Sequence, residues 1–372
     1  MMDSDKDALR LKLALSFTPG MTAAMAELIG ESGISWKQFT TMSSAELSGI
    51  CQGNIADKVK RQEADFRACK ELEFIERHHV KAHFISDESY PFLLRQISDP
   101  PIVLYQLGDT DLNAERLISV VGTRRITPYG AKQCQKIVEE SAVLFPDAII
   151  VSGLAYGTDT IAHQTALSSG MITVGVVAHG LDTLYPAQNR DLARRMIKEG
   201  GSILSEYPSG TTPFQRRFLE RNRIVAGLAQ LTLIIESPIR GGAMSTANSA
   251  FNYSREVMAL PGRVGDEMSE GCNMLIRREK AHLISGAADI VESMGWTPKA
   301  LQPEAVQRDL FPEMSDLGKK IHGALKSQNE PLSLDALYGL TRIPVAQLMS
   351  ALTDMEFDGI VIRHPGNRFS VS

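Results

Sequence analysis

The chain has 372 residues, of which 43% are hydrophobic and 22% charged, and its formal net charge is −5 at pH 7. This composition predicts a soluble globular protein of two or three domains, and the acidic balance argues against a general polyanion binder, so any nucleic-acid contact must come from a local basic patch. No run approaches the roughly 18 apolar residues of a membrane span, and the amino-terminal residues are charged, so we expect a cytoplasmic protein with no membrane association. The cysteines lack disulfide or zinc spacing, so we expect no metal: Cys51, Cys69, Cys134 and Cys272.

Residues 1–75 are predicted to form a small helical domain without strands, of the SAM or helix-hairpin-helix type. Thr18-Pro19-Gly20 separates two amphipathic segments, and Ser43-Ser44 is placed to cap a further helix. A proline-glycine turn between helices resembles helix-hairpin-helix modules, whose turn amides can hold a DNA phosphate. A packing or partner-contact domain explains the same pattern, and we favour this second interpretation.

Residues 76–296 are predicted to form an α/β domain. From Leu117 to Leu260 the pattern of a buried strand, a polar loop and a helix recurs about six times, which indicates right-handed crossovers and a mainly parallel sheet. Residues 76–116 predict an extended connection that adds one edge strand near Ile102–Tyr105. Because the loops after parallel strands share one edge of the sheet, we expect their polar residues to converge on one crevice.

The stretch from Ile149 to Leu167 is the clearest example of this pattern. A β-branched strand ends at Ser152-Gly153, and a helix follows for which Thr158 or Asp159 is a candidate cap. Free backbone N–H groups and the positive end of the helix dipole favour an anion at such a point, and phosphate is the usual one. We therefore expect a phosphate-facing turn after this strand.

The strand before it ends in the same way. Residues 117–121 form an apolar run that leads into Gly122, Thr123, Arg124 and Arg125, and Thr127-Pro128 then predicts a capped helix start. Two such turns on neighbouring strands would face the same crevice.

The segment 211–228 concentrates arginines in an otherwise acidic chain. Arg216, Arg217, Arg221 and Arg223 fall within about two helical turns, beside Asn222. The apolar residues of this segment recur at helical spacing, and we expect them to form a buried stripe that leaves most arginines on the other flank: Phe214, Phe218, Val225 and Leu228. The alternative is a solvated helix face with i,i+4 pairs such as that between residues 216 and 220.

Other polar residues at strand ends have two interpretations. Asp182 and Glu206 can carry out acid–base chemistry or can orient neighbouring arginines and amides, and we favour the second. His179, also at a strand end, is a better candidate for a site residue than His163. His163 has no Ser, Cys or second His placed by sequence to partner it, which argues against nucleophilic catalysis. The chain lacks GxxxxGK[ST], and no GxGxxG follows the first strand, so we expect no nucleotide cofactor.

Seven motifs, in order, resemble the DprA/Smf family of DNA-processing proteins over roughly residues 85–295: VGTRR, SGLAYGTDTIAH, GLDTLYPAQN, SEYPSGTTPF, ERNRIVAGL, ESPIRGGAMSTA and MALPGRV. The resemblance implies an extended Rossmann-like domain that binds single-stranded DNA and forms a homodimer. It also implies loading of the RecA recombinase onto strands coated with single-strand-binding protein, chiefly during natural transformation. No cofactor and no established catalysis are implied.

Carried over by position, Arg124 resembles the strand-end arginine that the family uses on the DNA backbone. Asn222 and Arg223 resemble its RNR element, and the turn at 152–157 its second phosphate-facing turn. Ala187 stands where relatives often have lysine, so one backbone contact is expected to be missing or to come from another arginine such as Arg125, Arg190 or Arg216. With bases stacked on exposed aromatic rings, the full set of expected DNA contacts is Gly122, Thr123, Arg124, Arg125, Ser152, Gly153, Gly157, Asp182, Tyr185, Asn189, Arg216, Arg221, Asn222, Arg223, Gly241 and Gly242.

The stretch 271–285 resembles the region through which the family dimerises. It contains Met274, Leu275 and Leu283, which we expect at a dimer interface. Plain core packing explains the same apolar residues, and the sequence by itself does not separate the two interpretations.

Residues 297–313 are predicted to be a linker, and residues 314–372 a winged-helix domain of three helices and a hairpin. In a DNA reader the third helix should be basic, yet 345–357 carries Asp354 and Glu356, runs into Asp358 and has no Lys or Arg. We therefore expect a protein-contact or regulatory domain. Phosphate contacts are expected only from the wing, at Arg363, His364 and Arg368.

Two other functions fit parts of the sequence. Gly241-Gly242 before a helix start resembles the phosphate loop of nucleoside-monophosphate phosphoribohydrolases, with Glu236 and Arg240 in the catalytic roles, although the spacing departs from their PGGxGT-E pattern. A pure assembly scaffold is the third interpretation, and it predicts no DNA binding at any salt concentration.

Overall fold

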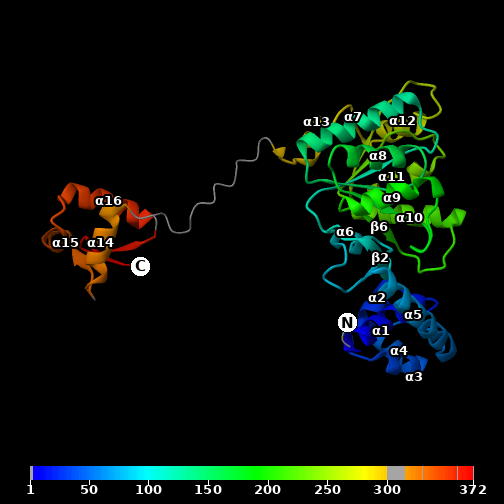
Figure 1. Cartoon of the computed structure of the whole chain (residues 1–372), viewed down its shortest axis with the longest axis horizontal. Coiled ribbons are helices and arrows are strands. Elements are labelled where there is room, and N and C mark those ends of the chain that lie inside the picture. The colour runs from blue at the N-terminus through cyan, green and yellow to red at the C-terminus, as the bar shows by residue number, and fades with distance from the viewer. Residues whose placement is uncertain (1–2, 300–314, 329, 358, 372) are drawn as a thin grey trace. The chain divides into compact units, whose positions relative to one another are not determined.

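The computed structural model describes residues 3–299, 315–328, 330–357 and 359–371. The chain divides into two compact units with a boundary near residue 301. The first unit contains the amino-terminal helices and the large sheet, and the second is the small carboxyl-terminal domain (Figure 1).

The amino-terminal region is entirely helical. Four of its helices have an N-terminal capping residue whose side chain accepts a hydrogen bond from a backbone amide of the first helical turn. These capping residues are Thr22, Ser35, Ser43 and Asp57. Arg61 is fully buried and donates to three backbone carbonyls, which ties the last helix to the loops around it. The helices are α1 (Asp3–Phe17), α2 (Ala23–Glu31), α3 (Trp36–Thr41), α4 (Ser44–Cys51) and α5 (Lys58–His78).

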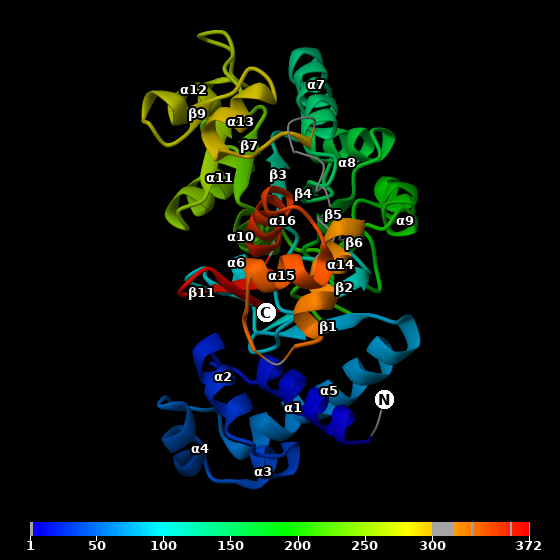
Figure 2. The same ribbon diagram turned by 90° about the vertical axis from the view of Figure 1, so that its left-hand side faces the viewer.

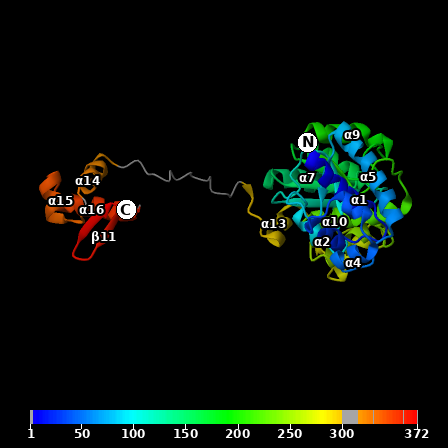
Figure 3. The same cartoon turned by 90° about the horizontal axis from the view of Figure 1, so that it is seen from below.

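These helices pack directly on the sheet domain. Helix α1 contacts the strand β2 (Val103–Gly108), and Leu13 of the helix and Tyr105 of the strand belong to one continuous apolar core. Helix α5 extends three residues beyond the expected boundary at residue 75. Residues 3–299 therefore form one packed body, with the helices beneath the sheet in Figure 1 and nearest the viewer in Figure 3.

The described part of the first unit contains a nine-stranded sheet in the order β1-β2-β6-β5-β4-β3-β7-β8-β9. The seven neighbouring strands β6-β5-β4-β3-β7-β8-β9 all pair in parallel, which confirms the predicted mainly parallel α/β fold. The expectation of one added strand is corrected to two, because β2 pairs antiparallel with β6 and β1 pairs antiparallel with β2 at the edge of the sheet. The other strands are β1 (Lys81–Phe84), β3 (Leu117–Val121), β4 (Ile149–Ser152), β5 (Thr173–Val176), β6 (Ser202–Ser205), β7 (Leu231–Ile234), β8 (Glu256–Ala259) and β9 (His282–Leu283).

Helices cover both faces of the sheet, because the central strands are apolar on both faces. Ile118 and Ile150 face a core shared with α7 and α8, whereas Leu117 and Ile149 face a core shared with α10 and α11. Figure 2 shows α10 and α11 on one side of the strands and α8 and α9 on the other. The helices are α6 (Phe92–Arg95), α7 (Pro128–Leu144), α8 (Thr158–Ser168), α9 (Arg190–Lys198), α10 (Gln215–Leu228), α11 (Gly242–Asn252), α12 (Glu270–Arg277) and α13 (Ala288–Met294), with a 3₁₀ turn at Ala187–Asn189.

The second unit is a winged helix, as predicted. Its helices surround a core that includes Ile321, Leu337, Leu348 and Phe369, and its three strands pair in the order β10-β12-β11. The elements are α14 (Asp316–Lys326), β10 (Leu332–Ser333), α15 (Leu334–Thr341), α16 (Val345–Phe357), β11 (Val361–His364) and β12 (Arg368–Val371). Most of the predicted linker 297–313, and Asp358 after α16, lie outside the described residues.

Candidate nucleic-acid interface

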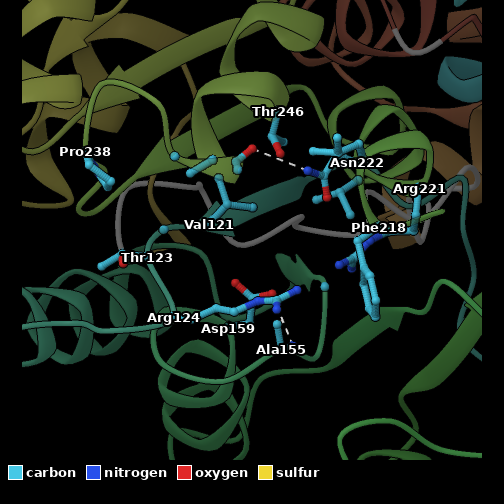
Figure 4. Close-up of a pocket in the computed structure, with 17 residues that line it drawn as sticks. Val121, Thr123, Arg124, Ala155, Asp159, Phe218, Arg221, Asn222, Pro238 and Thr246 are labelled. Atoms are coloured by element: carbon cyan, nitrogen blue, oxygen red, sulfur yellow. Dashed lines mark hydrogen bonds between the residues drawn. The ribbon is translucent and has the colours of Figure 1, made fainter. Parts of the chain in front are cut away.

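A cavity of about 220 Å³ lies at the carboxyl ends of β3, β4 and β7. It is lined by the loops after these strands, by the middle of α10 and by the start of α11 (Figure 4). Of the predicted contact residues, the structure brings eight together around this cavity: Gly122, Thr123, Arg124, Gly153, Arg221, Asn222, Gly241 and Gly242. The predicted convergence of strand-end loops on one crevice therefore holds for these residues.

Arg221 forms the floor of the cavity. Its side chain is only 3% exposed, and its guanidinium donates to the carbonyl of Val176. Burial lowers the pKa of Arg221 to about 10, the nearby Asp159 carboxylate opposes that shift, and Arg124 adds to it. Arg221 is therefore a cation at neutral pH. A Cβ on Gly153 would lie 2.0 Å from Nη1 of Arg221, so the glycine makes room for this arginine.

The turns after β3 and β4 pack against each other. The Thr158 amide donates to the carbonyl of Thr123 over 3.3 Å, and a Cβ on Gly157 would lie 2.5 Å from that same oxygen. Gly157 has φ +74°, which favours glycine. The Thr158 amide at the start of α8 is therefore occupied by a hydrogen bond within the protein.

Two expectations about this second turn are corrected. The Ser152 hydroxyl is fully buried and donates to the carbonyl of Val120 over 2.6 Å, so it does not face the cavity. Asp159 accepts from the Ala155 amide over 3.2 Å and places a carboxylate where a phosphate was expected. Burial raises the pKa of Asp159, and Arg221 opposes that shift.

The start of α11 is the better anion site. Gly241 precedes this helix without a side-chain cap, and Gly242 and Ala243 line the cavity. The Asn222 side-chain amide donates to the carbonyl of Gly242 over 3.3 Å and fixes the turn (Figure 4). An uncapped helix start opposite two arginines favours a phosphate between them.

A second hollow, of about 530 Å³, continues from the cavity along α10. It shares Arg124 and Phe218 with the cavity and adds Tyr185 and Phe214. We call Tyr185, Phe214 and Phe218 the aromatic shelf. The Tyr185 and Phe218 rings lie 5.7 Å apart between centroids, and the Tyr185 and Phe214 side chains are 43% and 62% exposed.

Arg124 connects the cavity to the shelf. Its guanidinium carbon lies 5.1 Å from the centroid of the Phe218 ring, and its side chain is exposed. No ion pair involves Arg124 in the part of the chain that the structure describes. Its charge is therefore available to an anion from solvent, and it stands beside a face on which a base can stack.

The structure places the aromatic residues of α10 differently from the predicted buried stripe. Phe214 and Phe218 lie on the shelf, whereas Val225 and Leu228 are buried as expected. The stripe is interrupted because the apolar core that contains Val225 and Leu228 does not extend to Phe214 and Phe218. The sequence signal for this was the group of arginines beside the two rings, since Arg216 and Arg217 keep their charged groups at the surface there.

Arg223 was predicted to line the same crevice, and this prediction is wrong. Its guanidinium donates to both carboxylate oxygens of Glu206, over 3.1 and 2.7 Å, and pairs with Asp99 over 3.0 Å. It lines a separate hollow of about 740 Å³ between the amino-terminal helices and the sheet. Residues 221 and 223 project in different directions because successive residues of a helix are rotated by about 100°.

Other predicted contacts have partners within the protein. Asn189 is 5% exposed and its side chain donates to the carbonyl of Leu154, so it supports the fold. The Asp182 carboxylate accepts from the Gly210 amide over 3.0 Å. Arg216 is exposed and pairs with Glu220 over 2.8 Å, as the solvated-face alternative expected, and Arg125 is exposed beside Thr123.

The residues of the hydrolase interpretation do not meet. The Glu236 carboxylate is 2% exposed and accepts from the amide and the hydroxyl of Thr127 over 2.9 and 2.6 Å. It lines a different hollow, with Tyr129 and the loop 261–269, and Arg240 is exposed on the surface. Glu236 therefore fixes the start of α7, and it is not directed at the glycine turn of α11.

The residues expected at a dimer interface lie in different environments. Leu275 is 2% exposed and belongs to the core, so the expectation of an interface contact there is corrected. Met274 is half-buried, and Leu283 is 50% exposed on the edge strand β9. Only the last two present apolar surface to a partner.

The winged helix has few cationic side chains on its third helix and its wing, the elements through which DNA-binding winged helices contact DNA. The described residues of α16 include no Lys or Arg, and Asp354 and Glu356 are exposed. On the wing, Arg363 donates to Asn367, His364 bonds to Ser370, and Arg368 is exposed. In the described parts of the whole chain no helix could cross a membrane, and no group of three potential ligands could hold a metal ion.

Comparison with known proteins identifies the family. The model of the DNA recombination-mediator protein A family matches residues 81–295, and that of the DprA winged helix domain matches residues 297–367. The chain is 32% identical to Protein Smf of Synechocystis over 336 residues, which covers 80% of this chain and 82% of the relative. It is 36% identical to DNA processing protein DprA of Streptococcus pneumoniae over 242 residues, or 61% of this chain and 84% of the relative.

Two solved structures have the same fold. The X-ray structure of DprA from Streptococcus pneumoniae has a TM-score of 0.63 at 30% identity, and covers 79% of this chain and 99% of that one. A structure concerned with the single-stranded DNA binding mode of DNA processing protein A from Helicobacter pylori has a TM-score of 0.52 at 32% identity, and covers 58% and 95% of the two chains. The extended Rossmann-like sheet, the winged helix and the matching sequence together place this chain in the DprA/Smf family of DNA-processing proteins.

Proposed function

We propose that this protein binds single-stranded DNA along the cavity and the aromatic shelf. The observation that carries the proposal is the position of Arg124, which borders both. A phosphate fits between Arg124, Arg221 and the uncapped start of α11, and the adjoining bases then lie over exposed aromatic rings.

The same geometry favours single strands over duplexes. Bases stack on protein rings only when they are not stacked and paired within a double helix. The cavity of about 220 Å³ accommodates a phosphate group, not the backbone and groove of a duplex. The aromatic shelf and the small volume of the cavity therefore both favour single-stranded DNA over duplex DNA.

The relatives support a wider role. Their names describe DNA processing and recombination mediation, and the Helicobacter pylori protein is described as binding single-stranded DNA. We propose that this protein, as a cytoplasmic homodimer, loads RecA onto strands coated with single-strand-binding protein, as in natural transformation. We assign it no catalytic step and no cofactor.

The test is fluorescence anisotropy with labelled oligo-dT and a duplex of equal length at two salt concentrations. Single-stranded binding should be tighter and should weaken with salt by about 0.7 log units per log unit of salt for each phosphate contacted. Arg124→Ala should weaken it, whereas Arg194→Ala, which removes an arginine 73% exposed on α9, should not. Equal binding of both DNA forms, or no salt dependence, would rule out the proposal.

RecA loading needs its own assay. Strand exchange by RecA on DNA coated with single-strand-binding protein should start sooner when the wild-type protein is added, and Arg124→Ala should not have this effect. If the protein binds DNA but leaves the lag unchanged, DNA binding stands and the loading role is rejected.

A further inference from the structure

The loop that carries part of the aromatic shelf is bonded to the amino-terminal helices. This loop, residues 206–214, connects β6 to α10 and ends at Phe214. Glu71, on α5, accepts hydrogen bonds from the Ser209 amide over 3.0 Å and from the Ser209 hydroxyl over 2.6 Å. The contact joins residues 138 positions apart and is one of the links between the helical region and the sheet domain.

The next residue of the loop is hydrogen-bonded to the loop that carries Tyr185, another residue of the shelf. The Gly210 amide donates to Asp182 over 3.0 Å, and the Gly180 amide donates to the carbonyl of Thr211 over 2.9 Å. Asp182 and Gly180 belong to the loop that carries Tyr185 of the shelf. The two loops that carry Tyr185 and Phe214 are therefore tied together at the point where Glu71 binds.

The approach of these loops is close. A Cβ on Gly180 would lie 2.5 Å from both the Asp182 carboxylate and the carbonyl of Pro208. A shift of the 206–214 loop would thus also move residues 180–182. We therefore expect the two loops to move together when the contact that fixes Ser209 is lost.

The Glu71 side chain is buried, and its carboxylate contacts the loop. Its side chain is 4% exposed, and in the described residues it forms no ion pair that would offset the burial of its charge. Within the described ranges, the hydrogen bonds of its carboxylate all come from Ser209. A buried carboxylate without an ion pair is costly, and here the largest compensation comes from the two Ser209 hydrogen bonds, with a smaller contribution from the charge of Arg67.

We propose that Glu71 is a positioning residue, through which the amino-terminal helical domain sets the geometry of the aromatic shelf by way of Ser209, Gly210 and Asp182. Glu71 does not touch DNA in this arrangement. The consequence for DNA binding rests on the proposed function, whereas the bracing of the loops does not.

The first experiment measures the bracing without DNA. Hydrogen exchange of the full-length protein is compared for the wild type, Glu71→Ala, Glu71→Gln and Glu63→Ala, which removes an exposed carboxylate from the same helix. Exchange at Ser209–Thr211 should be about tenfold faster in Glu71→Ala and should spread to 180–185. Glu71→Gln should restore part of the protection, because its amide oxygen can still accept from Ser209, and Glu63→Ala should match the wild type.

Ser209→Ala provides the matched change from the loop side. It removes only the hydroxyl donor, so the fold is retained even if Glu71→Ala unfolds. Its effect on exchange should not add to that of Glu71→Ala, because both substitutions break the same contact. Unchanged exchange in Ser209→Ala, or full additivity of the two, overturns the inference.

The second experiment measures oligo-dT affinity of the same variants. Glu71→Ala should weaken it roughly three- to tenfold, with Glu71→Gln in between and Glu63→Ala unchanged. If the wild type itself does not bind oligo-dT, the proposed function fails while the exchange result stands. If exchange changes as expected but affinity does not, the loops are braced but the shelf does not depend on them, and the positioning role is rejected.

Discussion

The guanidinium carbon of Arg124 lies 5.1 Å from the centroid of the Phe218 ring. One residue comes from the turn after β3 and the other from α10, and the pair stands between a cavity suited to phosphate and a shelf suited to bases. A cation beside an aromatic face can hold a phosphate while the neighbouring base stacks on the ring.

Arg124→Ala should weaken binding of oligo-dT by about tenfold, because a charge-assisted contact to a phosphate is lost. The salt slope should fall by about 0.7 at the same time, since one fewer counterion is displaced. Arg124→Lys should retain the slope but recover only part of the affinity, because a lysine cannot form the planar contact with the ring. Anisotropy titrations at several salt concentrations measure both quantities, and an unchanged slope in Arg124→Ala would contradict the phosphate contact.

Phe214→Ala should reduce affinity for single-stranded DNA without changing stability. The side chain is 62% exposed, so little core packing is lost, whereas stacking contributes about 1–3 kcal/mol per base. Thermal denaturation and oligo-dT binding of the same preparation separate the two effects. Phe251→Ala, at a side chain 45% exposed on α11, serves as the control, and equal losses in both variants would argue against the shelf.

Gly157→Ala should destabilise the protein by on the order of 2 kcal/mol or more, because φ is +74° and the new Cβ would lie 2.5 Å from the Thr123 carbonyl oxygen. Gly170→Ala is the control, since Gly170 has φ +75° but no atom within 4 Å of the added Cβ. Urea denaturation should show a clearly smaller loss for Gly170→Ala. Equal losses would mean that backbone strain alone, and not the contact between the two turns, sets the cost.

Glu71→Gln should make stability less dependent on pH. Burial raises the pKa of Glu71 in the folded protein above its ordinary value of 4.5, with the Ser209 hydrogen bonds opposing the shift. The folded state then binds this proton more tightly than the unfolded state, so the contribution of Glu71 to stability falls as pH rises above about 4.5. The difference in unfolding free energy between wild type and Glu71→Gln should therefore move against the wild type from pH 4.5 toward neutral.

Asp159 and Glu206 also have pKa values raised by burial and contribute with the same sign, so the comparison needs the paired variant and not the wild type alone. Urea denaturation at intervals between pH 4.5 and 7 gives the two curves. Parallel curves would show that the Glu71 carboxyl has an ordinary pKa.

Incubation with AMP or CMP should release no free base. The Glu236 carboxylate is already bonded to Thr127 and lies away from the glycine turn of α11, so the acid and the phosphate loop of a nucleoside-monophosphate hydrolase do not meet. Chromatography of the reaction mixture detects the base. Turnover that is lost in Glu236→Gln would instead favour the hydrolase over the mediator.

Much of the fold follows from local patterns in the sequence. The alternation of short apolar strands with capped helices predicts the parallel sheet, and Thr127 and Ser43 cap helices at the expected places. Strand β1 was not predicted, because it has four residues of which only the last two are buried, and it is completed by pairing with β2. The winged helix was recognisable because its helices and hairpin lie in sequence order.

The site was only partly predictable. Glycine turns and Arg124 at strand ends are local features, and the parallel topology brings them to one edge of the sheet. Which arginine faces that edge depends on helix rotation and on distant partners: Arg221 points into the cavity, whereas Arg223 is taken by Glu206 and Asp99.

The sequence by itself determined the order of elements, the family motifs and the positions where a turn needs glycine, because these depend on residues close together in the chain. Only the tertiary structure decided that Ser152 is buried, that Phe218 is not, and that Glu71 holds Ser209. Each of these depends on contacts between segments far apart in the chain, and burial and hydrogen bonding of that kind are settled only when the segments pack together.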